Sequence, residues 1–210
     1  MQAGLTVFSG SLAIHAKIII NAYICVMRFS GFILKILGWK TLGTVAPDKK
    51  CVILEAPHTS MWDFFIGYLF YRSVGGRLQI MIKKEFFVFP LGPVLKALGG
   101  FPIDRAHPAA TIRDTIHKLT EKDGRTFHMV MCPEGTRKAV HKWKTGYHTI
   151  ARAADMPVYL GFIDWGHKRV GLDPTKVELT DDARADTDRI QKMYEDMDLV
   201  PLHPQGYATK

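Results

Sequence analysis

Residues 51–63 read CVILEAPHTSMWD, and this stretch sets the expected fold. Its first part, 51–56, is almost entirely apolar, which is typical of a buried strand. A Pro-His turn follows, and either Thr59 or Ser60 can then cap the start of a helix. The sequence therefore predicts a buried strand that leads through a short polar loop into an aromatic-rich helix over 61–72.

The same alternation of short apolar runs and helix-like stretches continues along the chain. Strands that alternate with helices are typical of a sheet covered on both faces. The predicted fold class is α/β, with a mixed, largely parallel sheet flanked by helices. Further strands are expected over 78–82, 101–103, 127–131, 157–163 and 170–179, and further helices within 85–100 and over 109–123, 144–154 and 181–197.

The chain is basic, with a net charge of +8 and a pI of about 9.4. Residues 1–172 carry 23 Lys and Arg against 11 Asp and Glu, whereas 173–198 carry 4 against 9. The strong positive charge of residues 1–172 favours an anionic partner, such as nucleic acid, a membrane surface or a phosphorylated substrate. Because 47% of the residues are hydrophobic, the chain is not a disordered tail, and its three isolated cysteines give no cysteine-only zinc site.

The first 38 residues form a separate apolar segment, followed by an α/β domain over 39–210. Lys17, Arg28 and Lys35 are spaced by eleven and seven residues, which returns helical side chains to within about 20° of one face. A narrow cationic stripe on an apolar helix, or on two helices hinged near Ser30, predicts a segment that lies in a membrane interface. Packing on the protein's own core and a true membrane span are the alternatives.

His58 and Asp63 form the first group that could carry chemistry. A histidine after a strand can turn back onto an aspartate in the first turn of the next helix. The aspartate then orients one ring nitrogen, and the other is free to take a proton from a hydroxyl group. Ser60 is a cap rather than a nucleophile, so we expect the pair to activate an acceptor directly. In the alternative interpretation, Asp63 only stabilises the helix N-terminus and His58 is an ordinary turn residue.

Two further turns carry groups that suit phosphate. Residues 99–105 read GGFPIDR, so that a short strand delivers Arg105 at its end. Residues 132–138 read CPEGTRK after a buried strand, at the edge of the sheet where α/β proteins bind ligands. There Gly135 allows a tight turn and Arg137 supplies positive charge. Each turn alone could also be a solvated surface turn.

Together, the three groups resemble the sequence blocks of the glycerolipid acyltransferase family, which includes the lysophosphatidic acid acyltransferases. The matching blocks are His58-x4-Asp63, Phe101-Pro-Ile-Asp-Arg105 and Pro133-Glu-Gly-Thr-Arg137, in this order. The resemblance covers about residues 50–163.

The resemblance implies transfer of a fatty acyl group from a thioester, acyl-CoA or acyl carrier protein, to a lysophospholipid such as 1-acylglycerol-3-phosphate. His58 would be the general base and Asp63 would orient it. No metal, prosthetic group or nucleic acid is implied, and the protein is expected at the cytoplasmic face of a membrane as a peripheral or monotopic protein. The acceptor's phosphate and glycerol would be bound by Arg105, Glu134, Gly135, Thr136 and Arg137.

Three departures from the family pattern leave the acceptor open. Pro57 stands where the family often has Asn, Lys138 stands where it often has Ser, and the strand near Pro157 keeps only the first of two prolines. An amine-containing lipid is therefore an alternative acceptor. A thioesterase and a non-catalytic basic module that binds membrane or phosphate are the alternative functions, and oligomeric state is left open.

Overall fold

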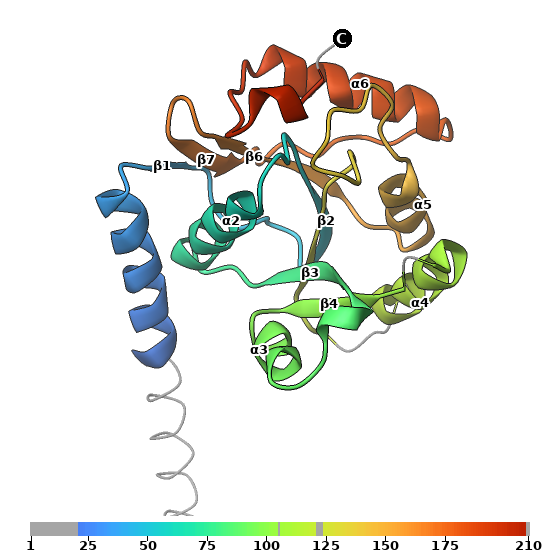
Figure 1. The fold of residues 1–210 in the computed structure, drawn as a ribbon. Helices are drawn as coiled ribbons and strands as arrows, with labels where there is room; N and C mark the ends of the chain where they lie inside the picture. The colour runs from blue at the N-terminus through green and yellow to red at the C-terminus, as the bar shows by residue number, and fades with distance from the viewer. Residues whose placement is uncertain (1–20, 105, 121–123, 209–210) are drawn as a thin grey trace, which may run out of the picture.

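The computed structural model describes residues 21–104, 106–120 and 124–208, which form an α/β fold around one seven-stranded sheet (Figure 1). The strand order is β1-β7-β6-β2-β5-β3-β4, and every neighbouring pair is parallel except β6 and β7. The expected mixed, largely parallel sheet is therefore confirmed. The strands are β1 (Lys40–Leu42), β2 (Lys50–Glu55), β3 (Leu78–Lys83), β4 (Gly100–Ile103), β5 (Phe127–Met131), β6 (Val158–Asp164) and β7 (Arg169–Leu172).

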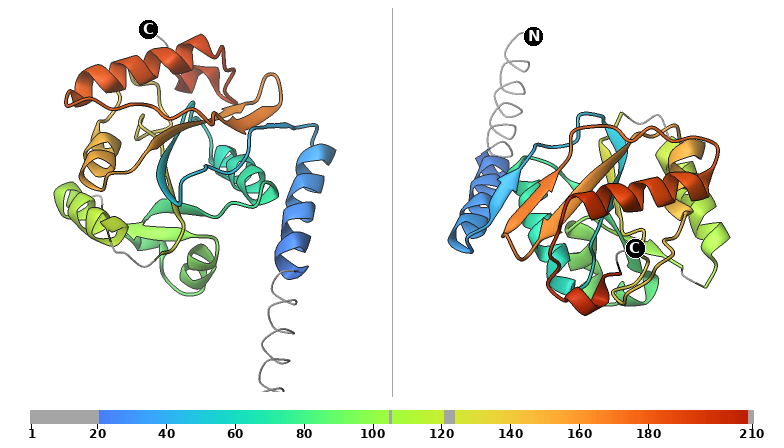
Figure 2. Two further views of the ribbon diagram at one scale, coloured as in Figure 1. Left: turned by 180° about the vertical axis from the view of Figure 1, so that it is seen from behind. Right: turned by 90° about the horizontal axis from the view of Figure 1, so that it is seen from above.

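Helices cover both faces of this sheet (Figure 2). A helix over residues 21–36 and α2 lie on one face, while α4, α5 and α6 lie on the other. The short elements η1 and α3 connect β3 to β4, and η2 lies near the C-terminus. The helical bounds are α2 (Met61–Ser73), η1 (Lys84–Phe86), α3 (Leu91–Ala97), α4 (Pro108–Thr120), α5 (Gly146–Ala153), α6 (Ala183–Asp196) and η2 (Pro204–Gly206).

Strand β2 divides the hydrophobic core into two layers because its side chains alternate between the faces of the sheet. Cys51 and Ile53 pack with residues of α2, whereas Val52 and Leu54 pack with residues of α4, α5 and α6. All four side chains are at most 4% exposed. Burial on both faces explains why this strand is a continuous apolar run in the sequence.

Most of the expected elements are present, with two differences at the edge of the sheet. Strand β1 is not among the expected strands, since its three residues are exposed and carry no apolar pattern. The last strand is expected over 170–179, but β7 ends at Leu172. The backbone N–H of Thr175 donates to the Asp173 side chain, and this turn at Asp173 and Pro174 interrupts the ladder. Beyond it, Val177 makes an isolated bridge to Val158.

The described part of the N-terminal segment is one continuous helix over 21–36, with no hinge at Ser30. Ser30 and Leu34 are buried on its inner side, and Tyr23 donates a hydrogen bond to the Gly75 carbonyl. The outer side exposes Phe32, among other apolar residues. One face therefore packs on the domain, as in the core-packing alternative, while the opposite face stays apolar and exposed.

Lys17, the first residue of the cationic stripe, lies outside the described residues. Arg28 and Lys35 are exposed on the helix over 21–36. Among the described residues, none of the helices combines the length and the apolarity needed to cross a bilayer.

Replacing Tyr194 with Phe should lower the free energy of unfolding by about 1 kcal/mol. The buried Tyr194 hydroxyl on α6 lies 2.7 Å from the Leu54 carbonyl and 2.9 Å from the Gly161 carbonyl, so that it fastens α6 to β2 and β6. The measurement is urea denaturation of both proteins. Tyr68→Phe on α2 is the control, and an equal effect of the two substitutions would contradict this role of the Tyr194 hydroxyl.

Candidate active site

Asp63 closes the loop between β2 and α2. Ser60 is the N-cap of α2 and Asp63 is the third residue of the helix, which gives a capping box. The backbone N–H groups of Thr59 and Ser60 each donate to Asp63 Oδ2 at 2.8 Å. These bonds hold the loop that carries His58, and of the two caps that the sequence allowed, the structure uses Ser60.

The His58 ring lies against the same carboxylate. Its Nδ1 atom is buried and lies 3.4 Å from Asp63 Oδ2, which is a close electrostatic contact rather than an aligned hydrogen bond. The His58 side chain is 21% exposed, while that of Asp63 is 1% exposed. Because Nδ1 faces the carboxylate, Nε2 is the nitrogen left to exchange a proton with a ligand.

Trp165 holds the other oxygen of Asp63, a contact that no sequence pattern indicated. Its indole Nε1 donates to Asp63 Oδ1 at 2.7 Å from the turn that follows β6. The Trp165 ring packs edge-on against Trp39 at 4.9 Å between centroids, and Lys168 lies over both rings. Since Trp165 is 102 residues away from Asp63, no local motif could have revealed it.

The surrounding groups make the His58 ring a stronger base. Burial alone would lower the pKa of His58, but the ionised Asp63 carboxylate beside Nδ1 outweighs it, so that this pKa is raised above its usual value. Burial would likewise raise the pKa of Asp63, but His58 and the donors from Ser60 and Trp165 outweigh it, so that this pKa is lowered. Asp63 therefore stays ionised beside an imidazole that holds its proton more tightly than a free histidine does, and His58 accepts a proton only after it has lost this one.

The third sequence block reaches His58 from the adjacent strand. Strands β2 and β5 are parallel neighbours, so the turns that follow them lie at one edge of the sheet. The buried Glu134 accepts a hydrogen bond from the His58 backbone N–H at 2.8 Å. Burial raises the pKa of Glu134 to about 8. Glu134 therefore connects the turn after β5 to the turn after β2.

The rest of that turn is more open. Gly135 has a φ of +67°, a left-handed conformation that favours glycine, and its N–H donates to the Cys132 carbonyl within the turn. Thr136 is half-buried and accepts a bond from the Lys138 backbone. Arg137 is exposed, and the structure shows no hydrogen bond or ion pair of its side chain with the described residues. Its guanidinium is available to an anion.

Arg105 lies outside the described residues, whereas its neighbour Asp104 is described. Asp104 follows β4 and forms an ion pair with Lys84 at 2.6 Å, and His107 Nδ1 lies 3.2 Å from the same oxygen. Since β4 is at the edge of the sheet, β3 and β5 separate this block from His58. The structure thus brings the first and third blocks together around His58.

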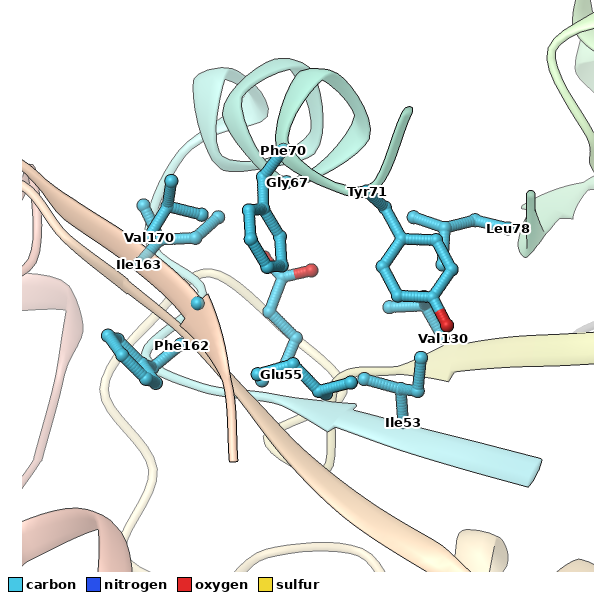
Figure 3. A pocket seen from close by; sticks show the side chains of 13 residues that line it. Ile53, Glu55, Gly67, Phe70, Tyr71, Leu78, Val130, Phe162, Ile163 and Val170 are labelled. Carbon is cyan, nitrogen blue, oxygen red and sulfur yellow. The ribbon is translucent and has the colours of Figure 1, made fainter. Parts of the chain in front are cut away.

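Glu55 is a second acidic residue that sequence reasoning missed. It ends β2 and its side chain rises towards Gly67 and Phe70 of α2, as Figure 3 shows. Its Oε1 atom is buried and has no hydrogen-bond partner among the described residues. Burial raises the pKa of Glu55 to about 7. Its position as the last residue of an apolar strand was the signal available in the sequence.

The cavity beside Glu55 has a volume of about 30 Å³. Ligand pockets are usually of the order of 300 Å³ or more, so this cavity is not a substrate pocket. Among the described residues, no cluster of three or more His, Cys, Asp or Glu side chains could hold a metal ion. Burial raises the pKa of the Cys132 thiol, which keeps it neutral beside His58.

The family model for Acyltransferase matches residues 41–160, which include His58, Asp63 and the turn at Glu134. The chain belongs to the acyltransferase family. This match covers more than half of the chain, and it confirms at the family level the resemblance drawn from the three sequence blocks. The protein is an acyltransferase.

One solved structure shares the fold of this acyltransferase over most of its length. It is the 1-acyl-sn-glycerophosphate (LPA) acyltransferase PlsC from Thermotoga maritima, with a TM-score of 0.58 and 15% sequence identity, and the match covers 86% of this chain and 81% of that one. At this identity, the likeness supports the fold. A search of curated proteins by sequence gives no match.

Replacing Glu55 with Gln should stabilise the acyltransferase at alkaline pH. The folded protein holds Glu55 protonated up to about pH 7, whereas in the unfolded chain its pKa is near 4.5. The stability that the neutral form contributes is present below pH 4.5 and is lost as the pH rises through 7. Because Gln stays neutral, we expect Glu55→Gln to be more stable than the wild type by about 1–3 kcal/mol at about pH 8 and to differ least near pH 5.

Urea denaturation at both pH values provides the measurement. Glu85→Gln is the control, because Glu85 is exposed on η1 and its substitution should give no such pH dependence. A difference between wild type and Glu55→Gln that is the same at both pH values would argue against a raised pKa of Glu55.

Proposed function

We propose that the protein is a membrane-associated acyltransferase that moves a fatty acyl group from a thioester donor to the hydroxyl of a lysophospholipid such as 1-acylglycerol-3-phosphate. The observation that carries this proposal is the His58–Asp63 pair beside the turn that holds Arg137. The donor is acyl-CoA or acyl carrier protein, and the reaction needs no metal or resident cofactor.

In the proposed mechanism, His58 is the general base and transfer is direct, without an acyl-enzyme. Nε2 takes the proton of the acceptor hydroxyl while its oxygen attacks the thioester carbonyl carbon. Asp63 holds Nδ1 and stabilises the imidazolium that forms. When the tetrahedral intermediate collapses, the carbon–sulfur bond breaks and the imidazolium returns the proton to the leaving thiolate. Trp165 and the loop N–H groups keep the carboxylate in place.

Cationic side chains beside the pair would recognise the acceptor. An Arg fork binds phosphate oxygens at two points, and the exposed Arg137 is free to do so at the edge of the sheet. Arg105, which follows β4 in the sequence and lies outside the described residues, is proposed as a second cation for the same phosphate, while Glu134, Gly135 and Thr136 would shape the turn around the glycerol. The T. maritima protein with the similar fold is a 1-acyl-sn-glycerophosphate (LPA) acyltransferase, whose acceptor is of this class.

The membrane contact of residues 1–38 is part of the proposal, as is the division into this segment and a domain over 39–210. The helix over 21–36 exposes Phe29, Phe32 and Ile36 at 62%, 59% and 67%. Apolar side chains and the nearby cations Arg28 and Lys35 suit an interface with anionic lipid headgroups. The proposed location is the cytoplasmic face of a membrane, with peripheral or monotopic attachment.

His58→Ala and Asp63→Ala should each lower acyl transfer by about 10²–10⁴-fold, since each removes part of the general base. The measurement uses the purified protein with a panel of lysolipids and both donor types, and it identifies products by mass spectrometry. His117→Ala, an exposed histidine on α4, should keep normal turnover and serves as the matched control.

Two outcomes of this assay speak against the proposal. Unchanged turnover in His58→Ala would exclude this mechanism. Release of free fatty acid in place of an acylated lysolipid would point to a thioesterase instead. Acylation of an amine-containing lipid alone would keep the mechanism but replace the acceptor.

Arg137→Ala should raise the KM for a phosphorylated lysolipid by about tenfold, a typical effect of losing a charge-assisted contact. The KM for a monoacylglycerol, which lacks the phosphate, should stay nearly unchanged. Arg113→Ala, on the exposed side of α4, is the control. If the KM values for both acceptors rise equally, Arg137 does not bind the phosphate.

A further inference from the structure

Exposed apolar side chains are concentrated in three segments of the described residues. Sixteen large hydrophobic residues are exposed there, and fourteen of them lie in these segments. Six belong to residues 24–37, three to the first turns of α2, and five to residues 86–94. By contrast, α4, α5 and α6 expose none of this set. Large exposed apolar patches mark interaction sites, so we expect these three segments to contact a binding partner.

Residues 86–94 contain the apolar side chains that are least covered by the rest of the protein. Phe89 is 89% exposed, the highest value among these side chains, and Val88 and Val94 are 62% and 53% exposed. The inner side of α3 is accounted for, since Gly92 is buried. Neither Phe86 nor Phe89 is buried.

The flanking charges suit an anionic surface. Lys83, Lys84 and Lys96 are exposed around this segment, against the single acid Glu85. Lys84 forms an ion pair with Asp104, so Lys83 and Lys96 contribute most of the positive charge. Lysines that flank exposed aromatic residues are typical of elements that enter a membrane interface.

The position of the segment places it at the edge of the sheet that carries the active site. Strands β2, β5 and β3 are parallel, so the chain leaves β3 at the edge where β2 leads into the His58 loop. Trp62, the neighbour of Asp63, is itself 60% exposed. The exposed apolar residues at the start of α2 therefore adjoin Asp63 in the chain. In Figure 1, α3 and the start of the described N-terminal helix both lie towards the lower side of the molecule.

We propose that residues 83–97 are a second membrane-contacting element, which inserts Phe86, Val88, Phe89 and Leu91 into the interface of an anionic bilayer. This inference rests on the proposed function, because it supplies the lipid surface that a lysophospholipid acyltransferase would need. It adds a contact that does not depend on the helix over 21–36. Two separate contacts fix the orientation of a domain on a membrane, whereas one leaves it free to rotate.

An acyl carrier protein is the other partner that this surface could meet. Such a carrier is acidic, so it would bind a surface on which positive charge predominates. Here the centre of the surface is apolar and the lysines lie at its margin. The distribution favours a bilayer.

The first experiment places a reporter at the tip of the segment in the full-length protein. Phe89→Trp is mixed with vesicles of phosphatidylcholine and phosphatidylglycerol, and its fluorescence is compared with that of the wild type, which contains four tryptophans. We expect a blue shift of the added signal and quenching by brominated acyl chains. Leu42→Trp, at an exposed position of β1, should give neither change.

The second experiment measures vesicle partition by flotation. Phe89→Ser should reduce partition about tenfold, in line with the loss of a buried aromatic side chain. Phe32→Ser should weaken the contact of the N-terminal helix, while Val200→Ser, an exposed control on the C-terminal segment, should leave partition unchanged. Because Phe89 is 89% exposed, its replacement leaves the core intact.

The outcomes separate this inference from the proposed function. If the wild type floats with vesicles but the Phe89→Trp signal does not shift and Phe89→Ser partitions normally, the second contact is wrong and the acyl-transfer proposal stands. If the indole of Phe89→Trp enters the bilayer but no lysolipid is acylated, the function fails and the contact stands. Loss of binding to acyl carrier protein in Phe89→Ser, with unchanged vesicle partition, would assign the surface to the carrier instead.

Discussion

The carboxylate of Asp63 is the group on which the site depends. It accepts hydrogen bonds from two backbone N–H groups of the His58 loop and from the indole N–H of Trp165, and it lies against the His58 ring. A cap at this position stabilises the start of a helix, while an ionised partner makes an imidazole more basic. One buried side chain therefore holds the loop, caps the start of α2 and sets the electrostatic environment of the His58 ring.

The parallel sheet brings the other loop of the site to His58. Because β2 and β5 are adjacent and run in the same direction, the loops that follow them lie at the same edge of the sheet. Glu134 then joins them by its bond to the His58 backbone. Burial raises the pKa values of Glu55 and Glu134, while the ionised Asp63 carboxylate raises that of His58. The site thus concentrates ionisable groups that an ordinary core would exclude, and folding stability becomes sensitive to pH.

The two faces of the molecule differ in the charge and the apolar surface that they expose. The acidic strip recognised in the sequence over 173–198 contains α6, which packs on the face opposite α2. Exposed aromatic and aliphatic side chains gather instead around the N-terminal helix, the start of α2 and the β3–β4 connection. A protein that takes lipid substrates from a bilayer has reason to keep its negative charge away from anionic headgroups. This asymmetry is consistent with the proposed function.

Most strands and helices, the cap at Ser60 and the pair formed by His58 and Asp63 could all be predicted from the amino-acid sequence. Each of these depends on residues close together in the chain, where apolar periodicity and capping rules apply. The same rules did not reveal β1, whose three residues pair only because β7 is beside them. Nor did they show that Trp165 would donate to Asp63 from 102 residues away, or that the Glu55 carboxylate would be buried. Such contacts are settled by the three-dimensional fold, because distant segments become neighbours through the packing of the whole sheet.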